Sequence, residues 1–219
     1  MSSESGIKTF RDSGGLWEEH DVNEVATPMA WWKNRDLVLR FYNERRKQLA
    51  ACEPNKGHFG LAKLESYFDV HIITQNIDDL HERAGSTKVM HLHGELTKAR
   101  STADSSLVYD IGYKNINSGD KCEKGSQLRP HIVWFHEEVP MLSEAVSLTS
   151  NADIFVVVGS SLNVYPAAGL ITYAPEASVK YIIDTNKPST TGIKSIVFMQ
   201  GKASDQVPTL VKKLLDEYD

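Results

Sequence analysis

The sequence predicts an α/β fold, a Rossmann-like parallel sheet with helices on both faces plus a small inserted module. Short runs rich in β-branched residues alternate with longer amphipathic stretches, the pattern of a parallel sheet covered by helices. Residues 153–159 read Asp-Ile-Phe-Val-Val-Val-Gly, and such a continuously apolar run is typical of a strand buried on both faces. We therefore expect a single domain over residues 1–219, with the small module at residues 97–127.

Each element has its own signal in the chain. Helices are expected where a proline or an amphipathic stripe marks them: about residues 31–51, 55–67 after Pro54, 141–149 after Pro140, and 205–218. Strands are expected at the short β-branched runs: residues 70–74, 88–92, 131–135, 153–159, 179–184 and 195–199. The module is polar, so we expect only a short strand at residues 107–109 there and no part of the core.

The composition is that of an ordinary globular protein, with 41% hydrophobic residues, 24% charged residues and a formal net charge of -5. A non-specific nucleic-acid surface carries a basic excess, so we expect no nucleic-acid partner. Neither a membrane-spanning run nor a secretory leader is recognisable, which disfavours a membrane partner. We interpret Cys52 and Cys122 as free thiols in a reducing compartment, the cytoplasm.

Polar residues follow three of the predicted strands, where open α/β sheets bind their ligands. These residues are Gln75, Asn76 and Asp78; His93; and Gly159, Ser160 and Ser161. Amides, carboxylates, an imidazole and a small-residue turn on one rim suit a polyhydroxyl, phosphate-bearing ligand. The three loops together therefore indicate a nucleotide site.

Each of these features also has a structural explanation. A Gly-Ser turn after a strand is more often only a turn, and Asp78 with Asp79 can cap a helix that begins near Leu80. His93 is one of 8 histidines, most of which we expect to be surface or hydrogen-bonded structural residues. The nucleotide interpretation depends on the loops occurring together.

Five stretches stand in one order along the chain: residues 4–12 (ESGIKTFRD), 74–85 (TQNIDDLHERAG), 91–96 (HLHGEL), 128–135 (LRPHIVWF) and 159–169 (GSSLNVYPAAG). They resemble successive motifs of the sirtuin family, and the resemblance covers essentially the entire chain. It implies an NAD-dependent protein-lysine deacylase, a desuccinylase, demalonylase and deacetylase that releases nicotinamide and an O-acyl-ADP-ribose. Acylated lysine side chains of proteins would be its substrates.

The resemblance also assigns roles to individual residues. His93 matches the catalytic histidine, which acts as the general base toward a ribose hydroxyl once the acyl oxygen has displaced nicotinamide. Around the nicotinamide end of NAD, the matches are Gln75 and Asn76 for the ribose, Asp78 for the amide, Phe10 as a shield of the reacting ribose carbon and Arg11 near the phosphates. Toward the adenosine end they are Gly159, Ser160 and Ser161 for the nucleotide loop, Asp184 and Asn186 for the ribose, and Ala203 for the adenine-side turn.

Two further features concern the acylated substrate. The strand around Val133 and Phe135, with Val164 in the last motif, resembles the sirtuin segments that bind the substrate peptide, in part through main-chain bonds. Tyr42 and Arg45 lie three residues apart, so both can face one carboxylate from the same side of a helix. This Tyr-x-x-Arg spacing marks the sirtuin class that removes succinyl or malonyl groups; without the resemblance, a solvated Arg-rich helix face is the simpler explanation.

The sequence departs from the family pattern in three places. It lacks the strand and the Gly-Ala-Gly-Ile-Ser loop that usually open the first motif, so we expect an exposed sheet edge or an apolar gap and a reduced phosphate cradle. Of the zinc cysteines usual in the module only Cys122 remains, and a tetrahedral site needs about four ligands, so we predict no zinc. His136 stands where glycine is usual.

An alternative function stays open. A catalytically impaired sirtuin-like fragment could serve as a non-enzymatic binding module, and the reduced glycine loop favours this interpretation. The retained set of His93, Asn76, Asp78, Tyr42 and Arg45 favours the enzyme. Hydrolysis of NAD without an acylated lysine is disfavoured by the substrate segment.

Overall fold

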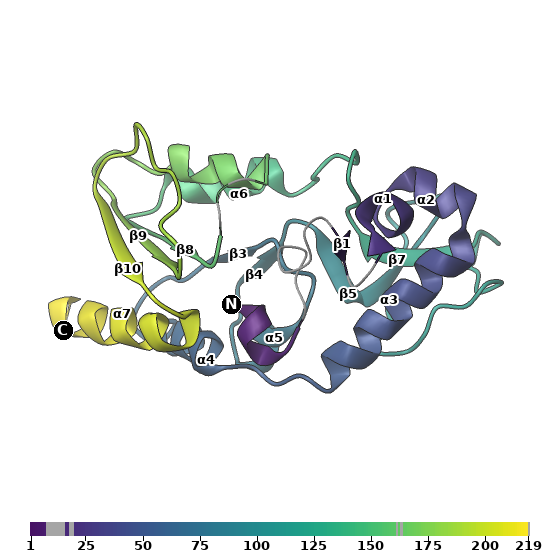
Figure 1. Cartoon of the computed structure of the whole chain (residues 1–219), viewed down its shortest axis with the longest axis horizontal. Coiled ribbons are helices and arrows are strands. Elements are labelled where there is room, and N and C mark those ends of the chain that lie inside the picture. The colour runs from purple at the N-terminus through teal and green to yellow at the C-terminus, as the bar shows by residue number, and fades with distance from the viewer. Residues whose placement is uncertain (8–15, 18–19, 161, 163, 219) are drawn as a thin grey trace.

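Two parallel sheets carry the strand ends at which the ligand is expected (Figure 1). One contains β8 (Ile154–Val158), β9 (Val179–Asp184) and β10 (Ile196–Gln200) in the order β10-β9-β8; in the other, β3 (Ile72–Thr74) pairs with β4 (Val89–His91). This computed structural model describes residues 1–7, 16–17, 20–160, 162 and 164–218. The expected α/β class is confirmed, and these strands begin and end within two residues of the predicted bounds.

Helices cover both faces of the three-stranded sheet. α4 (Lys56–Leu64) and α7 (Ala203–Tyr218) pack on one face, and α6 (Leu142–Ser150) with the 3-10 helix η3 (Ala167–Thr172) lies on the other (Figure 1). Side chains alternate between the faces of a strand. In β9, Tyr181 and Ile183 therefore join the core under α7, whereas Ile182 packs with Ile171 of η3.

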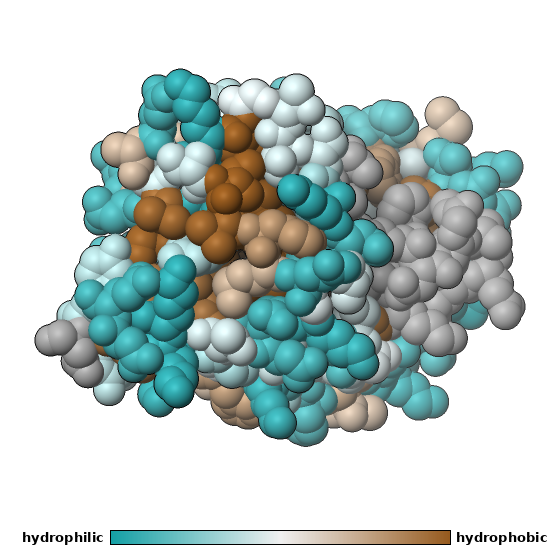
Figure 2. Space-filling model, turned by 60° about the vertical axis from the view of Figure 1, so that its left-hand side comes forward, coloured by the Kyte–Doolittle hydropathy of each residue, from teal (hydrophilic) through white to brown (hydrophobic). Residues whose placement is uncertain are grey.

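Hydrophobic residues also reach the surface on the side of β10 and α7. Figure 2 views the molecule from this side and shows an apolar band between hydrophilic areas.

Among the described helices, none combines the length and the apolar character that a bilayer crossing requires.

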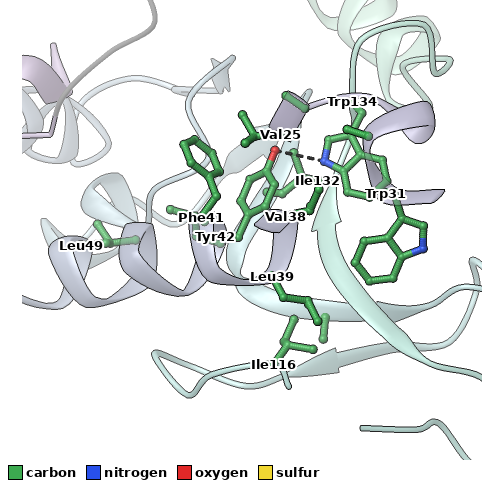
Figure 3. Packing of buried hydrophobic residues seen from close by; sticks show 14 of the residues in the cluster. Val25, Trp31, Val38, Leu39, Phe41, Tyr42, Leu49, Ile116, Ile132 and Trp134 are labelled. Carbon is green, nitrogen blue, oxygen red and sulfur yellow. Dashed lines mark hydrogen bonds between the residues drawn. The ribbon is translucent and has the colours of Figure 1, made fainter. Parts of the chain in front are cut away.

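A second core lies under α3 (Arg35–Ala50). This helix packs against an antiparallel sheet of β5 (Gly94–Ser101), β6 (Val108–Asp110) and β7 (Leu128–Ile132), in the order β6-β5-β7. The other elements among the described residues are η1 (Ser2–Ser5), β1 (Leu16–Trp17), β2 (His20–Asp21), α1 (Val22–Val25), α2 (Pro28–Lys33) and α5 (Leu80–Arg83). Figure 3 shows the side chains of this core, with Tyr42 of α3 close to Trp134.

The predicted single helix over residues 31–51 is wrong, because Asn34 separates α2 from α3. Asn34 has φ -151 and ψ 73, outside the helical region, and its side-chain oxygen accepts the Leu37 N–H at 3.1 Å. It therefore ends one helix and caps the next, a role that asparagine fills well.

Two predictions for the region after His93 are also wrong. The segment at residues 97–127 was expected outside the core, yet β5 runs to Ser101, and Ala99 and Ile116 are 0% and 2% exposed. The strand predicted at residues 131–135 ends at Ile132. By Phe135 the backbone has left the ladder with β5, because the Phe135 N–H bonds to the Ala26 carbonyl oxygen.

Candidate active site

His93 lies in the turn between β4 and β5. Its ring Nδ1 is 3.0 Å from the carbonyl oxygen of Gln75, so Nδ1–H donates to this oxygen and the lone pair remains on Nε2. Burial lowers the pKa of His93 below the ordinary value of 6.5, against the opposing effect of the Gln75 hydrogen bond. His93 is therefore neutral at pH 7 and able to accept a proton at Nε2.

Gly94 allows the chain to hold a histidine at this point. Its φ is +82, and a Cβ there would lie 2.0 Å from the carbonyl oxygen of His131. Only glycine lets β5 approach β7 so closely directly after His93. The Val133 N–H donates to the His93 carbonyl oxygen at 2.9 Å, which ties the histidine backbone to the segment after β7.

The amide and the carboxylate predicted after β3 meet at Ser2. The Asn76 side-chain amide donates to the Ser2 hydroxyl oxygen at 2.8 Å, and Ser2 also bonds to the carboxyl group of Asp78. Asp78 is 4% exposed, and burial raises its pKa, although the bonds from Ser2 and from the Leu80 N–H oppose the shift. The bond from Leu80 shows that Asp78 also has the structural role considered for it, at the start of α5.

The helix η1 joins this cluster to two other predicted nucleotide loops. The Glu4 carboxylate accepts N–H bonds from Ala203 at 2.8 Å and from Ser204 at 3.0 Å, in the first turn of α7, where a negative charge is favourable. Gly159 has φ +61, and a Cβ there would lie 2.9 Å from the Met1 nitrogen. Residues after β3, after β8 and at the start of α7 therefore surround one short helix.

The predicted adenosine-side residues lie at the ends of β8 and β9. The Ser160 hydroxyl oxygen accepts the Leu162 N–H at 3.3 Å. Asp184 accepts the Asn186 N–H at its carboxylate at 3.0 Å and the Gly201 N–H at its carbonyl oxygen at 3.1 Å. This turn therefore lies beside the loop that leads into α7.

Tyr42 and Arg45 are buried side chains of α3, with exposed fractions of 0% and 5%, which contradicts the solvated-face explanation. The Trp134 Nε1–H donates to the Tyr42 hydroxyl oxygen at 3.0 Å (Figure 3). Burial raises the pKa of Tyr42 and lowers the pKa of Arg45 to about 10. At neutral pH the pair therefore consists of a neutral phenol and a guanidinium cation in a poorly hydrated place.

The backbone after β7 is held by the rest of the chain. Phe135 is 42% exposed, so the tip of this segment faces solvent. Three successive backbone N–H groups donate within the chain: Val133 to the His93 carbonyl oxygen at 2.9 Å, Trp134 to the Glu137 carboxylate at 2.8 Å, and Phe135 to the Ala26 carbonyl oxygen at 3.0 Å.

Of the predicted residues not yet placed, the structure describes Val164 but not the other three. Val164 lies just before η3, and its carbonyl oxygen accepts the Ala168 N–H of this helix. Phe10, Arg11 and Ser161 lie outside the residues that the structure describes. Sequence reasoning missed Ser2, because a single serine beside a motif carries no signal of its own and its contacts with Asn76 and Asp78 exist only in the fold.

The fold and the rim of amides, carboxyl groups and a neutral histidine define a nucleotide-binding α/β protein. Residues 1–166 match the model of the Sir2 family. The chain is 50% identical over 216 residues to an NAD-dependent protein deacylase of Helicobacter pylori strain J99, covering 99% of this chain and 92% of that protein. It is 49% identical over 223 residues to an NAD-dependent protein deacylase of Bacteroides thetaiotaomicron, covering 98% of this chain and 94% of that protein.

Solved structures agree with these matches. A Sir2 homolog in complex with NAD has a TM-score of 0.89 at 36% identity, over 100% of this chain and 87% of that chain. Sir2Af2 bound to a myristoylated histone peptide has a TM-score of 0.72 at 34% identity, over 89% of this chain and 87% of that chain. The chain belongs to the Sir2 family.

Proposed function

We propose that this chain is an NAD-dependent protein-lysine deacylase that removes succinyl, malonyl and acetyl groups. The observation that carries the proposal is His93: a neutral imidazole, fixed through Nδ1 with Nε2 available, beside Gln75, Asn76 and Asp78 in a member of the Sir2 family. In this reaction the acyl group moves to ADP-ribose and nicotinamide leaves. Both relatives named above are NAD-dependent protein deacylases.

The donor set of the site suits NAD. Asp78 would hold the amide of nicotinamide, and its burial with a raised pKa favours hydrogen bonding to a neutral amide over attraction of a cation. Gln75 and Asn76 would hold the adjoining ribose, with Gly159, Ser160, Asp184, Asn186 and Ala203 toward the adenosine; Phe10, Arg11 and Ser161 complete the proposed set. When bound, NAD supplies the ribose to which the acyl group is transferred. His93 Nε2 accepts the proton of a ribose hydroxyl.

Tyr42 and Arg45 form the proposed acyl pocket. A succinyl or malonyl carboxylate would receive a hydrogen bond from the phenol and a charge-assisted bond from the guanidinium. Burial makes this recognition effective, because the lowered pKa of Arg45, about 10, reflects a cation that has lost solvation. An anionic acyl group would restore part of that lost stabilisation.

The segment of Val133 and Phe135 is the proposed binding place for the substrate peptide, together with Val164. Because the N–H groups of Val133 and Phe135 donate within the chain, the peptide would pair through its own N–H groups and the carbonyl oxygens of this segment. We also place the enzyme in the cytoplasm, where the two buried free thiols, Cys52 and Cys122, stay reduced.

The pH dependence of the reaction is expected to follow His93. A general base works unprotonated, so activity is present above the pKa of His93 and is lost as the pH falls through it. Since burial lowers this pKa, the acidic limb of the kcat/KM profile should lie below 6.5. Circular dichroism at each pH is the control for folding. Burial lowers the pKa values of His58 and His81 to about 3 and about 4, so both residues make the fold less stable as the pH falls below the ordinary histidine pKa. A limb above 6.5 in folded protein would contradict the assignment.

We propose that the module at residues 97–127 works without the structural zinc of its family. In the described part of the chain no three His, Cys, Asp or Glu side chains gather in a way that could hold a metal. Cys122 Sγ lies 3.3 Å from the Ser101 hydroxyl. The Gln127 side chain accepts the Gly119 N–H at 2.7 Å and donates to the Asn117 carbonyl oxygen at 2.9 Å, so an amide joins the two ends of this loop.

Removal of metal should therefore leave the module intact. We expect a strong chelator to change Tm by less than about 1 °C, whereas Gln127→Leu, which breaks these bonds, should lower it by about 5 °C. Differential scanning fluorimetry measures both. A stoichiometric zinc content by elemental analysis, with a large loss of Tm on chelation, would contradict the proposal.

The proposed function is tested by the products. The chain is incubated with NAD and a succinyl-lysine peptide, and mass spectrometry should find free lysine peptide, nicotinamide and O-succinyl-ADP-ribose in equal amounts. Free succinate without the ADP-ribose ester, in a short incubation in which the ester is stable, would point to another mechanism.

A further inference from the structure

The segment after β7 makes a tight turn that its sequence does not favour. The Glu137 N–H donates to the Trp134 carbonyl oxygen at 3.0 Å, which closes a turn over residues 134–137. Within this turn His136 has φ +70, a left-handed conformation that is unfavourable for a residue with a Cβ. The His136 side chain is exposed, so its own packing does not stabilise the turn.

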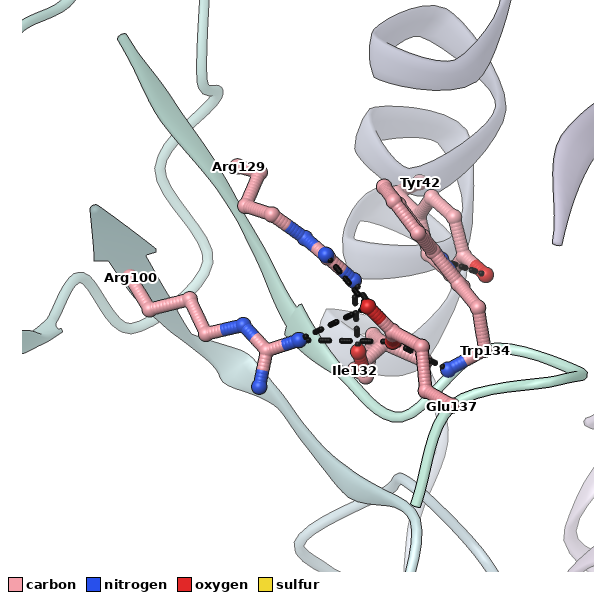
Figure 4. Close-up of polar contacts among 6 residues, drawn as sticks. All are labelled: Tyr42, Arg100, Arg129, Ile132, Trp134 and Glu137. Atoms are coloured by element: carbon pink, nitrogen blue, oxygen red, sulfur yellow. Dashed lines mark hydrogen bonds and ion pairs between the residues drawn. The ribbon is translucent and has the colours of Figure 1, made fainter. Parts of the chain in front are cut away.

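The Glu137 carboxylate stabilises this turn (Figure 4). Arg129 donates two bonds to it, of 2.7 and 3.0 Å, and Arg100 adds two of 3.3 Å. The carboxylate also accepts the backbone N–H of Trp134 at 2.8 Å, so it closes the turn from within. Burial of Glu137 works against its ionisation, but the bonds from Arg129 and Trp134 outweigh this effect, and its pKa is lowered.

The same arginine fixes the indole of Trp134. Arg129 is 8% exposed, its guanidinium lies 3.3 Å from the centre of the Trp134 ring, and it donates to the Ile132 carbonyl oxygen at 2.9 Å. Trp134 is 2% exposed and reaches Tyr42 through its Nε1–H. The Glu137 clamp, which we define as Glu137 with Arg100 and Arg129, therefore holds both the backbone of the turn and the side chain that contacts the proposed acyl pocket.

The position of this turn gives the clamp a role in the reaction. Just before the turn the Val133 N–H bonds to the carbonyl oxygen of His93, and at the first residue of the turn the Trp134 indole bonds to Tyr42. We propose that Glu137 is a positioning residue for the acylated peptide: its carboxylate holds the turn so that the segment after β7 is preformed between His93 and the acyl pocket. This inference rests on the proposed function and adds a residue that makes no contact with the reacting atoms.

Glu137→Gln tests the role, because glutamine keeps the shape of the side chain and loses the charge that pairs with the arginines. We expect the KM for a succinyl-lysine peptide to rise about tenfold, the effect of losing charge-assisted bonds. The KM for NAD and kcat should change by less than about twofold, since the proposed NAD-binding groups lie elsewhere. Glu138→Gln, at the exposed neighbouring carboxylate, is the matched control and should leave all three constants unchanged.

His136→Gly separates positioning from general stability. Glycine adopts a left-handed φ without steric cost, so the turn then depends less on the clamp. The double variant Glu137→Gln with His136→Gly should recover most of the peptide KM lost in the single variant. Arg100→Met removes only the longer bonds, should raise the peptide KM about threefold, and supplies the test if Glu137→Gln does not fold.

Three results would overturn the inference. They are an unchanged peptide KM in a folded clamp variant, an equal rise in the KM values of peptide and NAD, and the absence of rescue by His136→Gly. The last two would mean that the clamp only stabilises the fold. A wild-type chain that turns over no acylated peptide would instead remove the proposed function, and the inference with it, so the two failures are distinguishable.

Discussion

His93→Ala should lower kcat for deacylation about a thousandfold, within the roughly hundred- to ten-thousandfold that a positioned general base contributes. Alanine cannot take the proton that Nε2 accepts, and it also loses the Gln75 hydrogen bond that orients the ring. Steady-state kinetics with NAD and a succinyl-lysine peptide measure the loss. The variant should stay folded, because His93 lies in a turn and the bond between Val133 and its carbonyl oxygen is unaffected.

A second histidine provides the control for this experiment. His71→Ala changes a more exposed ring that pairs with Asp69 just before β3, and kcat should remain within about twofold of the wild type. Residual activity of more than a tenth in folded His93→Ala would show that another group is the base.

Arg45→Met should cost about a hundredfold in kcat/KM for a succinyl-lysine peptide and less than about threefold for an acetyl-lysine peptide. Removing one partner of a buried charged contact costs about 2 to 5 kcal/mol. Only the succinyl group has a carboxylate that makes such a contact with Arg45, so only the succinyl substrate loses it. Methionine keeps the apolar stem and the approximate length of the side chain, so its packing in α3 is largely preserved. Parallel kinetics on the two peptides give the ratio directly.

Arg40→Met is the matched control, since Arg40 lies on the same helix with an exposed side chain. It should leave both peptides unaffected. An equal loss on succinyl- and acetyl-lysine in Arg45→Met, at an unchanged Tm, would mean that Arg45 supports the site in general and does not read the acyl group.

The fold was predictable wherever one local signal dominated. The apolar run of β8 and the stripe of α7 were recognisable because burial on a sheet needs those patterns. The break at Asn34 was missed because an asparagine cap looks like any polar helix residue until its side chain is seen to accept the Leu37 N–H. The module was misread because Ala99 and Ile116 are isolated apolar residues in a polar stretch, and their burial depends on packing against α3.

The site was predictable in its parts more than in its connections. Residues at strand ends, such as Asn76 and His93, could be named because parallel strands end at one rim. Ser2 contacts Asn76, which lies 74 residues away, and Arg100 of the Glu137 clamp contacts a carboxylate 37 residues away. Neither contact leaves a pattern of spacing or composition, so only the tertiary structure reveals them.

The most direct test of the account is nicotinamide release from NAD by the purified chain, measured with a succinyl-lysine peptide, with an acetyl-lysine peptide and without peptide. Release that requires an acylated peptide, is faster with succinyl-lysine than with acetyl-lysine, and is absent in His93→Ala is the predicted result. A folded chain that releases no nicotinamide with any of the peptides, or releases it equally without peptide, would contradict the account.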